Sequence, residues 1–108
     1  MAFTPSRLYL GQPGITATTL YTVGASPAFL ILKEITISNT TTSAATITIG
    51  VNGVAAANAA LGYQISIPPN SVTDLGQLST ILNATDTLQA VQGTASAITL
   101  LVSGVLGP

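Results

Sequence analysis

Apolar and polar residues alternate along most of this chain, and the alternation constrains its fold more than any other feature. In the ranges 35–37, 47–49 and 65–67, an isoleucine stands on each side of a single Thr or Ser. The range 98–102 places Ile98, Leu100 and Val102 on one face in the same way. Because successive side chains of a strand point to opposite faces, the pattern predicts strands with one buried face.

Short apolar stretches of this kind recur about every 8 to 12 residues, with Gly, Pro or Asn between them. We therefore predict an all-β fold, namely a single antiparallel β-sandwich, jelly-roll-like, with about eight short strands. The expected strands lie within residues 7–10, 15–23, 29–37, 47–49, 65–67, 71–76, 86–93 and 97–105.

The connecting segments carry turn residues. The polar segment Asn39–Ala45 is expected to be a hairpin loop between antiparallel neighbours. Pro68 and Pro69 end a strand because proline cannot donate to a ladder, and Asn83–Asp86 is predicted to be a turn. The alanine-rich segment Val54–Gly62 is expected to be a loop or a short helix.

The length of 108 residues suits one domain. Residues 1–14 end in the turn sequence Gly11–Gly14, so we expect either an extended N-terminal arm outside the compact body or a part of that body. In the first case the β-sandwich domain comprises residues 15–108.

Charged and chemically reactive side chains are scarce. Five residues are charged, and the chain has no His, Cys or Trp. Imidazole bases, thiolate nucleophiles and the usual zinc ligands are therefore missing from the sequence. We predict a protein that is not an enzyme and that has no cofactor and no metal. The charged residues are Arg7, Lys33, Glu34, Asp74 and Asp86.

A glycosidase or an aspartic proteinase needs two carboxylates at one cleft. Glu34, Asp74 and Asp86 are the available acids. Asp86 stands in a turn, where aspartate commonly caps the backbone, and Lys33 and Glu34 would point to alternate faces of a strand. We expect three acids without a common site.

Partners can also be judged from charge and hydropathy. A net charge of −1 gives no basic patch for nucleic acid, and no apolar run approaches the roughly 20 residues that span a bilayer. The first residues do not resemble a signal peptide. We therefore expect neither a nucleic-acid partner nor a membrane, and synthesis in the cytoplasm.

One strand has an apolar run without alternation, formed by Phe29, Leu30, Ile31 and Leu32. A continuous run predicts that both faces of the strand are covered, although a small sandwich has a core on one side only. Leu101 in the last expected strand poses the same question. Either another subunit or another part of the chain covers the second face.

Residues 30–105 resemble small all-β structural proteins of tailed bacteriophages. The resemblance is carried by Ser38–Thr40 with the Thr/Ser/Ala loop behind it, by the turn and strand Leu82–Leu88, and by the closing strand Ile98–Gly104. The glycine usual in the turn is Thr85 here. These motifs are strand and turn signals, and none of them carries chemistry.

The resemblance implies a non-enzymatic virion component, made in the bacterial host and commonly a homotrimer. We expect a capsid decoration (cement) protein that contacts itself and the major capsid protein or another virion protein, and so stabilises the head. The expected interface residues are Arg7, Tyr9, Phe29, Leu30, Ile31, Leu32 and Leu101.

Two alternatives remain. A structural module of the tail, baseplate or fibre would share the fold and the composition. A carbohydrate-binding module for host recognition would use Tyr9, Tyr21 and Tyr63 as a stacking platform.

Overall fold

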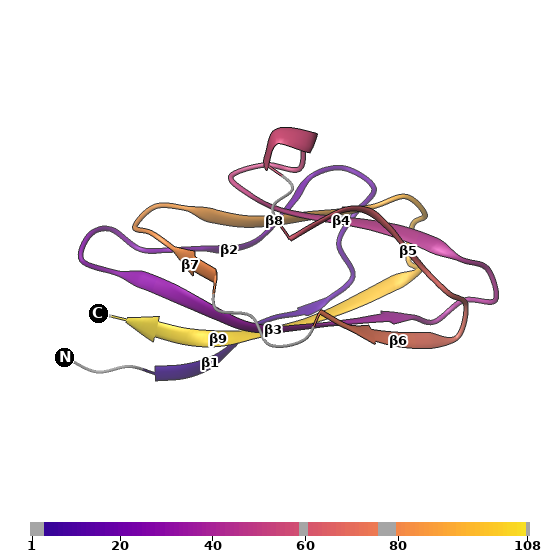
Figure 1. The fold of residues 1–108 in the computed structure, drawn as a ribbon, viewed down its shortest axis with the longest axis horizontal. Coiled ribbons are helices and arrows are strands. Elements are labelled where there is room, and N and C mark those ends of the chain that lie inside the picture. Colours follow the sequence, from indigo (N-terminus) through magenta and orange to yellow (C-terminus); the bar gives the residue numbers. More distant parts are fainter. Residues whose placement is uncertain (1–3, 59–60, 76–79, 108) are drawn as a thin grey trace.

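The computed structural model describes residues 4–58, 61–75 and 80–107. These residues form two antiparallel β-sheets that pack face to face (Figure 1). The predicted β-sandwich is confirmed, with nine strands in place of about eight. Among the described residues, no helix is long and apolar enough to cross a membrane.

The five-stranded sheet has the order β1-β9-β3-β6, and β7 pairs with β3 beyond the end of β6. The four-stranded sheet has the order β2-β8-β4-β5. The strands are β1 (Thr4–Gly11), β2 (Thr18–Thr22), β3 (Phe29–Asn39), β4 (Ala45–Val51), β5 (Gly62–Ile67), β6 (Ser71–Asp74), β7 (Thr80–Leu82), β8 (Thr87–Gln92) and β9 (Ile98–Gly107), with the 3₁₀ helix η1 (Ala56–Asn58) between β4 and β5.

The strand pairings are nested. β4 pairs with β5, β3 with β6 and β7, β2 with β8, and β1 with β9. These nested pairs correspond to a long antiparallel ribbon that is bent across the middle. The additional pairs β3·β9 and β4·β8 join its segments into two sheets. This order is the jelly-roll topology, as the sequence predicted.

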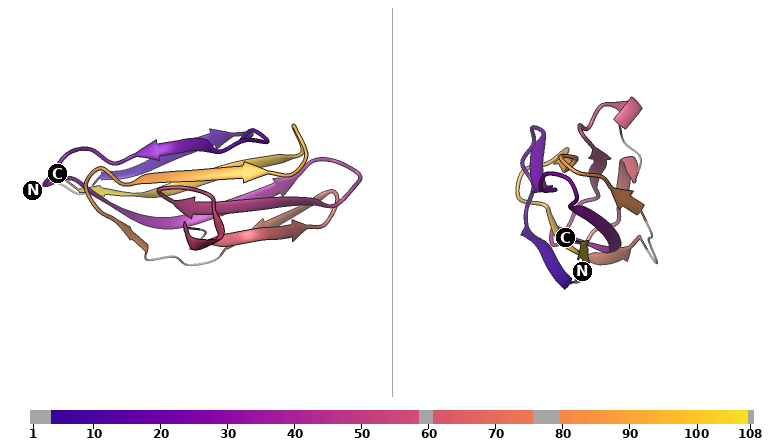
Figure 2. Two further views of the ribbon diagram at one scale, coloured as in Figure 1. Left: turned by 90° about the horizontal axis from the view of Figure 1, so that it is seen from above. Right: turned by 90° about the vertical axis from the view of Figure 1, so that its left-hand side faces the viewer.

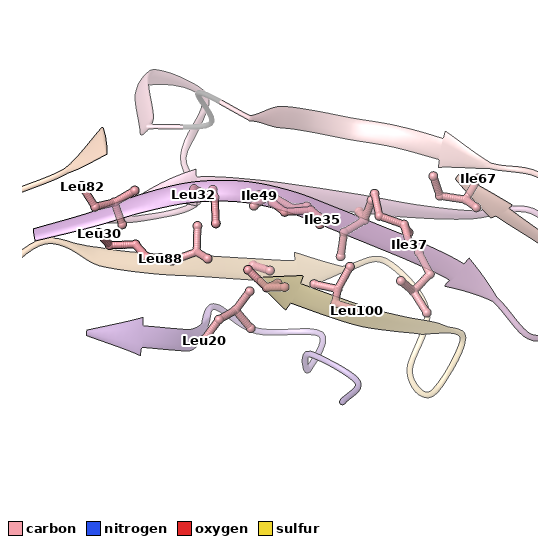
Figure 3. Packing of buried hydrophobic residues seen from close by; sticks show 14 of the residues in the cluster. Leu20, Leu30, Leu32, Ile35, Ile37, Ile49, Ile67, Leu82, Leu88 and Leu100 are labelled. Atoms are coloured by element: carbon pink, nitrogen blue, oxygen red, sulfur yellow. The ribbon is translucent and has the colours of Figure 1, made fainter. Parts of the chain in front are cut away.

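The core lies between the sheets and consists of aliphatic side chains (Figure 3). Leu30, Leu32 and Ile35 of β3 meet Leu88 and Ile49 across the gap, and all five are 0% exposed. Alternation places about every second residue of a strand in this layer, and aliphatic side chains fill it.

A β-bulge in β3 explains why the apolar pattern of this strand changes phase. Leu32 pairs with Gly104 and Glu34 with Ser103, so Lys33 is an extra residue without a register partner on β9. The bulge lets Leu32 and Ile35 both point inward although they are three positions apart. The expectation that Lys33 and Glu34 point to alternate faces is wrong, because both are exposed.

The segment Asn39–Ala45 is not a hairpin loop, in contrast to the prediction. It leads from β3 in one sheet to β4 in the other. The buried Asn39 holds this crossing, since its Nδ2 donates to the carbonyls of Ser43 (2.9 Å) and Ile67 (3.1 Å). Its Oδ1 accepts from the backbone N–H of Thr41 (3.0 Å).

The N-terminal segment forms an edge strand in this structure. β1 is antiparallel to β9 from Thr4 to Gly11, with a bulge between Arg7 and Tyr9. Leu8 and Tyr9 pack against the core. Within residues 1–14, for which the sequence left an arm or a part of the body open, Thr4–Gly11 thus form a strand of the five-stranded sheet.

Candidate functional site

The two outer faces of the sandwich differ in chemistry, and they are the surfaces that this fold offers to a partner. The outer face of the five-stranded sheet carries four of the six large hydrophobic residues that are well exposed among the described residues. They are Leu10, Val72, Ile81 and Leu101, with exposed fractions from 38% to 66%. An accumulation of exposed apolar side chains on one face is typical of an interaction surface.

Strand register arranges part of this face as a continuous apolar row. Pro5 of β1 is opposite Val105 of β9, Val105 is opposite Ile31 of β3, and Ile31 is opposite Ile81 of β7. Partners in an antiparallel register point to the same side of a sheet. We call these four residues the outer apolar row.

Phe29 lies beside this row. It pairs with Gly107, and a side chain at Gly107 would collide with the ring of Phe29. The ring therefore lies next to the backbone of Gly107 in β9 and is half-buried. It extends the apolar surface toward the end of the sheet.

Four of the five charged residues belong to the same sheet. Arg7 is in β1, Lys33 and Glu34 are at the bulge of β3, and Asp74 is the last residue of β6. The register of Arg7 and Glu34 with Ser103, and of Asp74 with Thr36, places Arg7, Glu34 and Asp74 on the outer face. The charges and the apolar row thus share one surface.

Glu34 and Asp74 lie close together, which the sequence did not predict. The charge of Asp74 and a side-chain hydrogen bond with it raise the pKa of Glu34 above its usual value of 4.5. Both carboxyls are exposed on a sheet face. Only the β3·β6 pairing brings them together, and that pairing has no local signal in the sequence. We call Glu34 and Asp74 the acid pair.

The outer face of the four-stranded sheet is uncharged. The strands β2, β4, β5 and β8 contain no charged residue. Many of their outward positions hold hydroxyl and amide side chains, such as Thr19 opposite Gln89, Thr22 opposite Thr87, and Thr46 opposite Ser66. We call this outer face of the four-stranded sheet the Thr/Gln face. Such side chains hydrogen-bond across a contact without the cost of desolvating an ion.

The structure places the predicted interface residues in three different environments. Phe29, Ile31, Leu101 and Arg7 lie on the outer face of the five-stranded sheet. Leu30 and Leu32 are 0% exposed in the core, so the sandwich itself covers them and no partner can reach them. Tyr9 is half-buried and packs against the core.

The three tyrosines do not form a platform in this arrangement. Tyr21 is on β2 and Tyr63 on β5, which are the opposite edges of the four-stranded sheet, and Tyr9 is in the other sheet. Among residues 4–58, 61–75 and 80–107, no group of three or more His, Cys, Asp or Glu side chains could hold a metal ion.

Asp86 has a structural environment. Its carboxylate accepts hydrogen bonds from Nδ2 of Asn52 (3.0 Å) and from the backbone N–H of Asn83 (2.9 Å), and both bonds lower its pKa. Oδ1 of Asn52 also accepts from the backbone N–H of Thr87 (2.9 Å). Asp86 therefore joins the end of β4 to the turn before β8, as expected for a turn aspartate.

Comparison with known proteins gives no family. No protein-family model matches the chain, and no curated protein matches it. A chain in the structure of infectious bursal disease virus, Gx strain, is similar over 96% of this chain with 14% identity and a TM-score of 0.48. A chain from the Gt strain of the same virus is similar over 97%, with 20% identity and a TM-score of 0.30. This chain spans 28% of either viral chain, and likenesses at these scores support no statement about its function.

Proposed function

We propose that this chain is a non-enzymatic structural protein of a tailed-bacteriophage virion, namely a capsid decoration protein that binds the head surface as an oligomer. The observation that carries the proposal is the pair of broad outer faces with different chemistry. A decoration protein needs one contact with its own copies and another with the shell, and each face suits one of these.

The fold supports the same proposal only by analogy with other proteins that have a jelly roll. The jelly roll is common in viral capsid proteins, and it also serves lectins and cupins, so it leaves the function open by itself. Two further points support the proposal. The resemblance carried by Ser38–Thr40, Leu82–Leu88 and Ile98–Gly104 favours the virion, and a sequence without His, Cys or Trp favours a non-enzymatic role.

The physical role would be stabilisation by mass action. A protein that binds only the mature lattice lowers the free energy of that lattice, by an amount that grows with its concentration relative to the dissociation constant. Several weak contacts from one oligomer add up, because each contact after the first is intramolecular. Strong individual contacts are therefore unnecessary, and an uncharged Thr/Gln face is adequate.

The test begins with virions of the virus that encodes the chain. Quantitative mass spectrometry of purified particles should find the chain in copy numbers comparable with the major capsid protein. A few copies per particle would assign it to the tail, baseplate or fibre instead. Absence from the particles would refute a virion role.

A second experiment uses heads that lack the protein. Adding the purified protein back should raise the temperature at which the heads release DNA. Thr19→Lys, which puts a charge on the Thr/Gln face of an otherwise unchanged sandwich, should weaken this binding. The matched variant Ile15→Lys, in the exposed connection between β1 and β2, should bind normally. Equal binding of both variants would exclude the Thr/Gln face as the docking surface.

A further inference from the structure

On the outer face of the five-stranded sheet the two acids lie away from Arg7, and Lys33 stands at the bulge of β3 beside Glu34. Arg7 is on β1, at one edge, and the acid pair is on β3 and β6, toward the other edge. Neighbouring strands are about 4.8 Å apart, so β1 and β6 are separated by about 14 Å across the sheet. Lys33 offsets one of the two carboxylates, so one molecule presents a positive edge at β1 and a net negative region on β3 and β6 of the same surface.

This arrangement is complementary to itself. A two-fold axis that runs parallel to the strands, between two such faces, reverses the strand order of the second copy. β1 then lies over β6 of the other copy, and β9 lies over β3. Arg7 of each copy comes to face the acid pair of the other, so the same ionic contact forms twice.

We propose that the outer face of the five-stranded sheet binds the same face of a second copy of this chain, related to the first by a two-fold axis parallel to the strands. The proposal goes beyond the virion role and stands without it. It commits this face to self-association and leaves the Thr/Gln face for another partner.

The outer apolar row fits the same axis. This rotation keeps each residue at its level along the strands and reverses the order of the strands. The outer apolar row of one copy therefore faces the outer apolar row of the other, with the strand order reversed. Val105 then faces Ile31 of the second copy, and Pro5 faces Ile81. The four residues span all the strands at that level of the sheet, so apolar side chains contact apolar side chains along the whole row. Sheets that pack face to face are about 10 Å apart, with strand directions about 30° apart.

The electrostatics of the single copy agree with this pairing. The carboxylate of Asp74 raises the pKa of Glu34, so the two carboxylates of the acid pair repel each other at neutral pH. A guanidinium from a second copy would lower this repulsion, and arginine can bind a carboxylate through two parallel hydrogen bonds.

The available surface is sufficient. A stable contact buries about 800 Å² per partner, which is about 15% of the 5420 Å² that the described protein exposes. A broad face of a small sandwich provides this area. A shell protein as the partner of this face would not require the positive and negative charges to lie at opposite edges.

The first test compares two matched lysine variants. Ile81 in the outer apolar row and Ile15 in the β1–β2 connection are 61% and 60% exposed, so each can be replaced without disturbing the core. By sedimentation equilibrium at micromolar concentration, the unmodified protein should be a dimer. Ile81→Lys should weaken the dimer at least tenfold, and Ile15→Lys should leave it unchanged. Circular dichroism melting checks that both variants are folded.

The second test reverses the charges on either edge. Arg7→Glu alone should weaken the dimer, since a glutamate then faces the acid pair in each of the two ionic contacts. The double variant Glu34→Lys with Asp74→Lys should weaken it for the opposite reason. Mixing these two proteins should restore a dimer that contains one of each, because both ionic contacts then join opposite charges.

Several results would overturn the proposal. One is a monomer at the highest soluble concentration, which would leave the face for a different protein. A homotrimer, as the family resemblance implies, would also overturn it, because a two-fold contact cannot close a ring of three. The remaining two are equal effects of Ile81→Lys and Ile15→Lys, and a mixture of the charge variants that stays monomeric.

Discussion

Replacing Gln92 with Leu should destabilise the sandwich more than its position at the end of a strand suggests. Gln92 is 1% exposed, and its Oε1 accepts hydrogen bonds from the backbone N–H groups of Ile98 (2.8 Å) and Ala97 (3.2 Å). Its Nε2 donates to the carbonyl of Pro13. One side chain therefore holds the β8–β9 turn and the β1–β2 connection together.

The expected loss of stability follows from the number of backbone groups that lose Gln92 as a hydrogen-bond partner. Leucine fills a similar volume but forms no hydrogen bond, so three buried backbone groups are affected. At about 1 kcal/mol for each, the low end of the cost of an unsatisfied buried group, the free energy of unfolding should fall by about 3 kcal/mol. For a domain of this size the melting temperature should then fall by about 12 °C or more.

Urea unfolding followed by circular dichroism measures this loss. The matched control is Gln89→Leu on the same strand, because Gln89 points outward and donates to the hydroxyl of Thr87 (3.0 Å). That variant should change the free energy of unfolding by less than about 0.5 kcal/mol. A loss below about 1 kcal/mol for Gln92→Leu would show that these backbone groups do not depend on the side chain.

Three other predictions concern single positions. Leu30→Lys should unfold the protein, because it places a charge in the core at a cost of several kcal/mol. Leu101→Lys should remain folded, and circular dichroism distinguishes the two variants. A folded Leu30→Lys protein would contradict the placement of Leu30 in the core. Thr85 has a φ of 67°, so Thr85→Gly should raise the free energy of unfolding by up to about 1 kcal/mol in urea titrations, and a loss would show that its side chain matters. The pKa of Glu34 is raised above 4.5 by Asp74, so its contribution to stability is complete below the unfolded pKa and is lost as the pH rises through the folded pKa. Glu34→Gln should remove this pH dependence in unfolding titrations of the monomer, and an unchanged profile would refute the coupling.

The sequence predicted the elements whose signal is local. Ile47 and Ile49, or Ile98 and Leu100, are two positions apart, and that spacing alone decides which face of a strand is buried. The turn at Thr85 was also predictable, and its positive φ accounts for the glycine usual in this turn of the resembling family. The small numbers of aromatic and charged residues also favoured a β-fold with an aliphatic core.

The sequence could not predict features that depend on pairing between distant strands. The hairpin expected at Asn39–Ala45 was wrong because β3 and β4 belong to different sheets, which only the nested topology decides. The acid pair of Glu34 and Asp74 likewise requires the β3·β6 register. The bulge had a signal, since the spacing from Leu32 to Ile35 breaks the two-residue period, but the continuous run before it obscured that break.

The outer face required both kinds of information. Leu101 was predictable as an outward apolar residue on its own strand. Leu30 and Leu32 were not distinguishable from Phe29 and Ile31 within an unbroken apolar run, and only their position on β3 decides which pair is outside. The outer apolar row exists only once four strands are aligned.

The pairing of β1 with β9 also affects how the protein can be tagged. Thr4 is opposite Leu106, so the first and last described residues lie at the same end of the sandwich (Figure 2). A fusion partner at either end would therefore start next to Pro5 and Val105. A bulky fluorescent domain there would block the face-to-face contact, whereas a probe in the exposed segment Thr42–Ala44 would lie at the far end of β3 from Phe29. Reporter position is thus an experimental variable in this protein, and fusions at the two ends are not independent controls for each other.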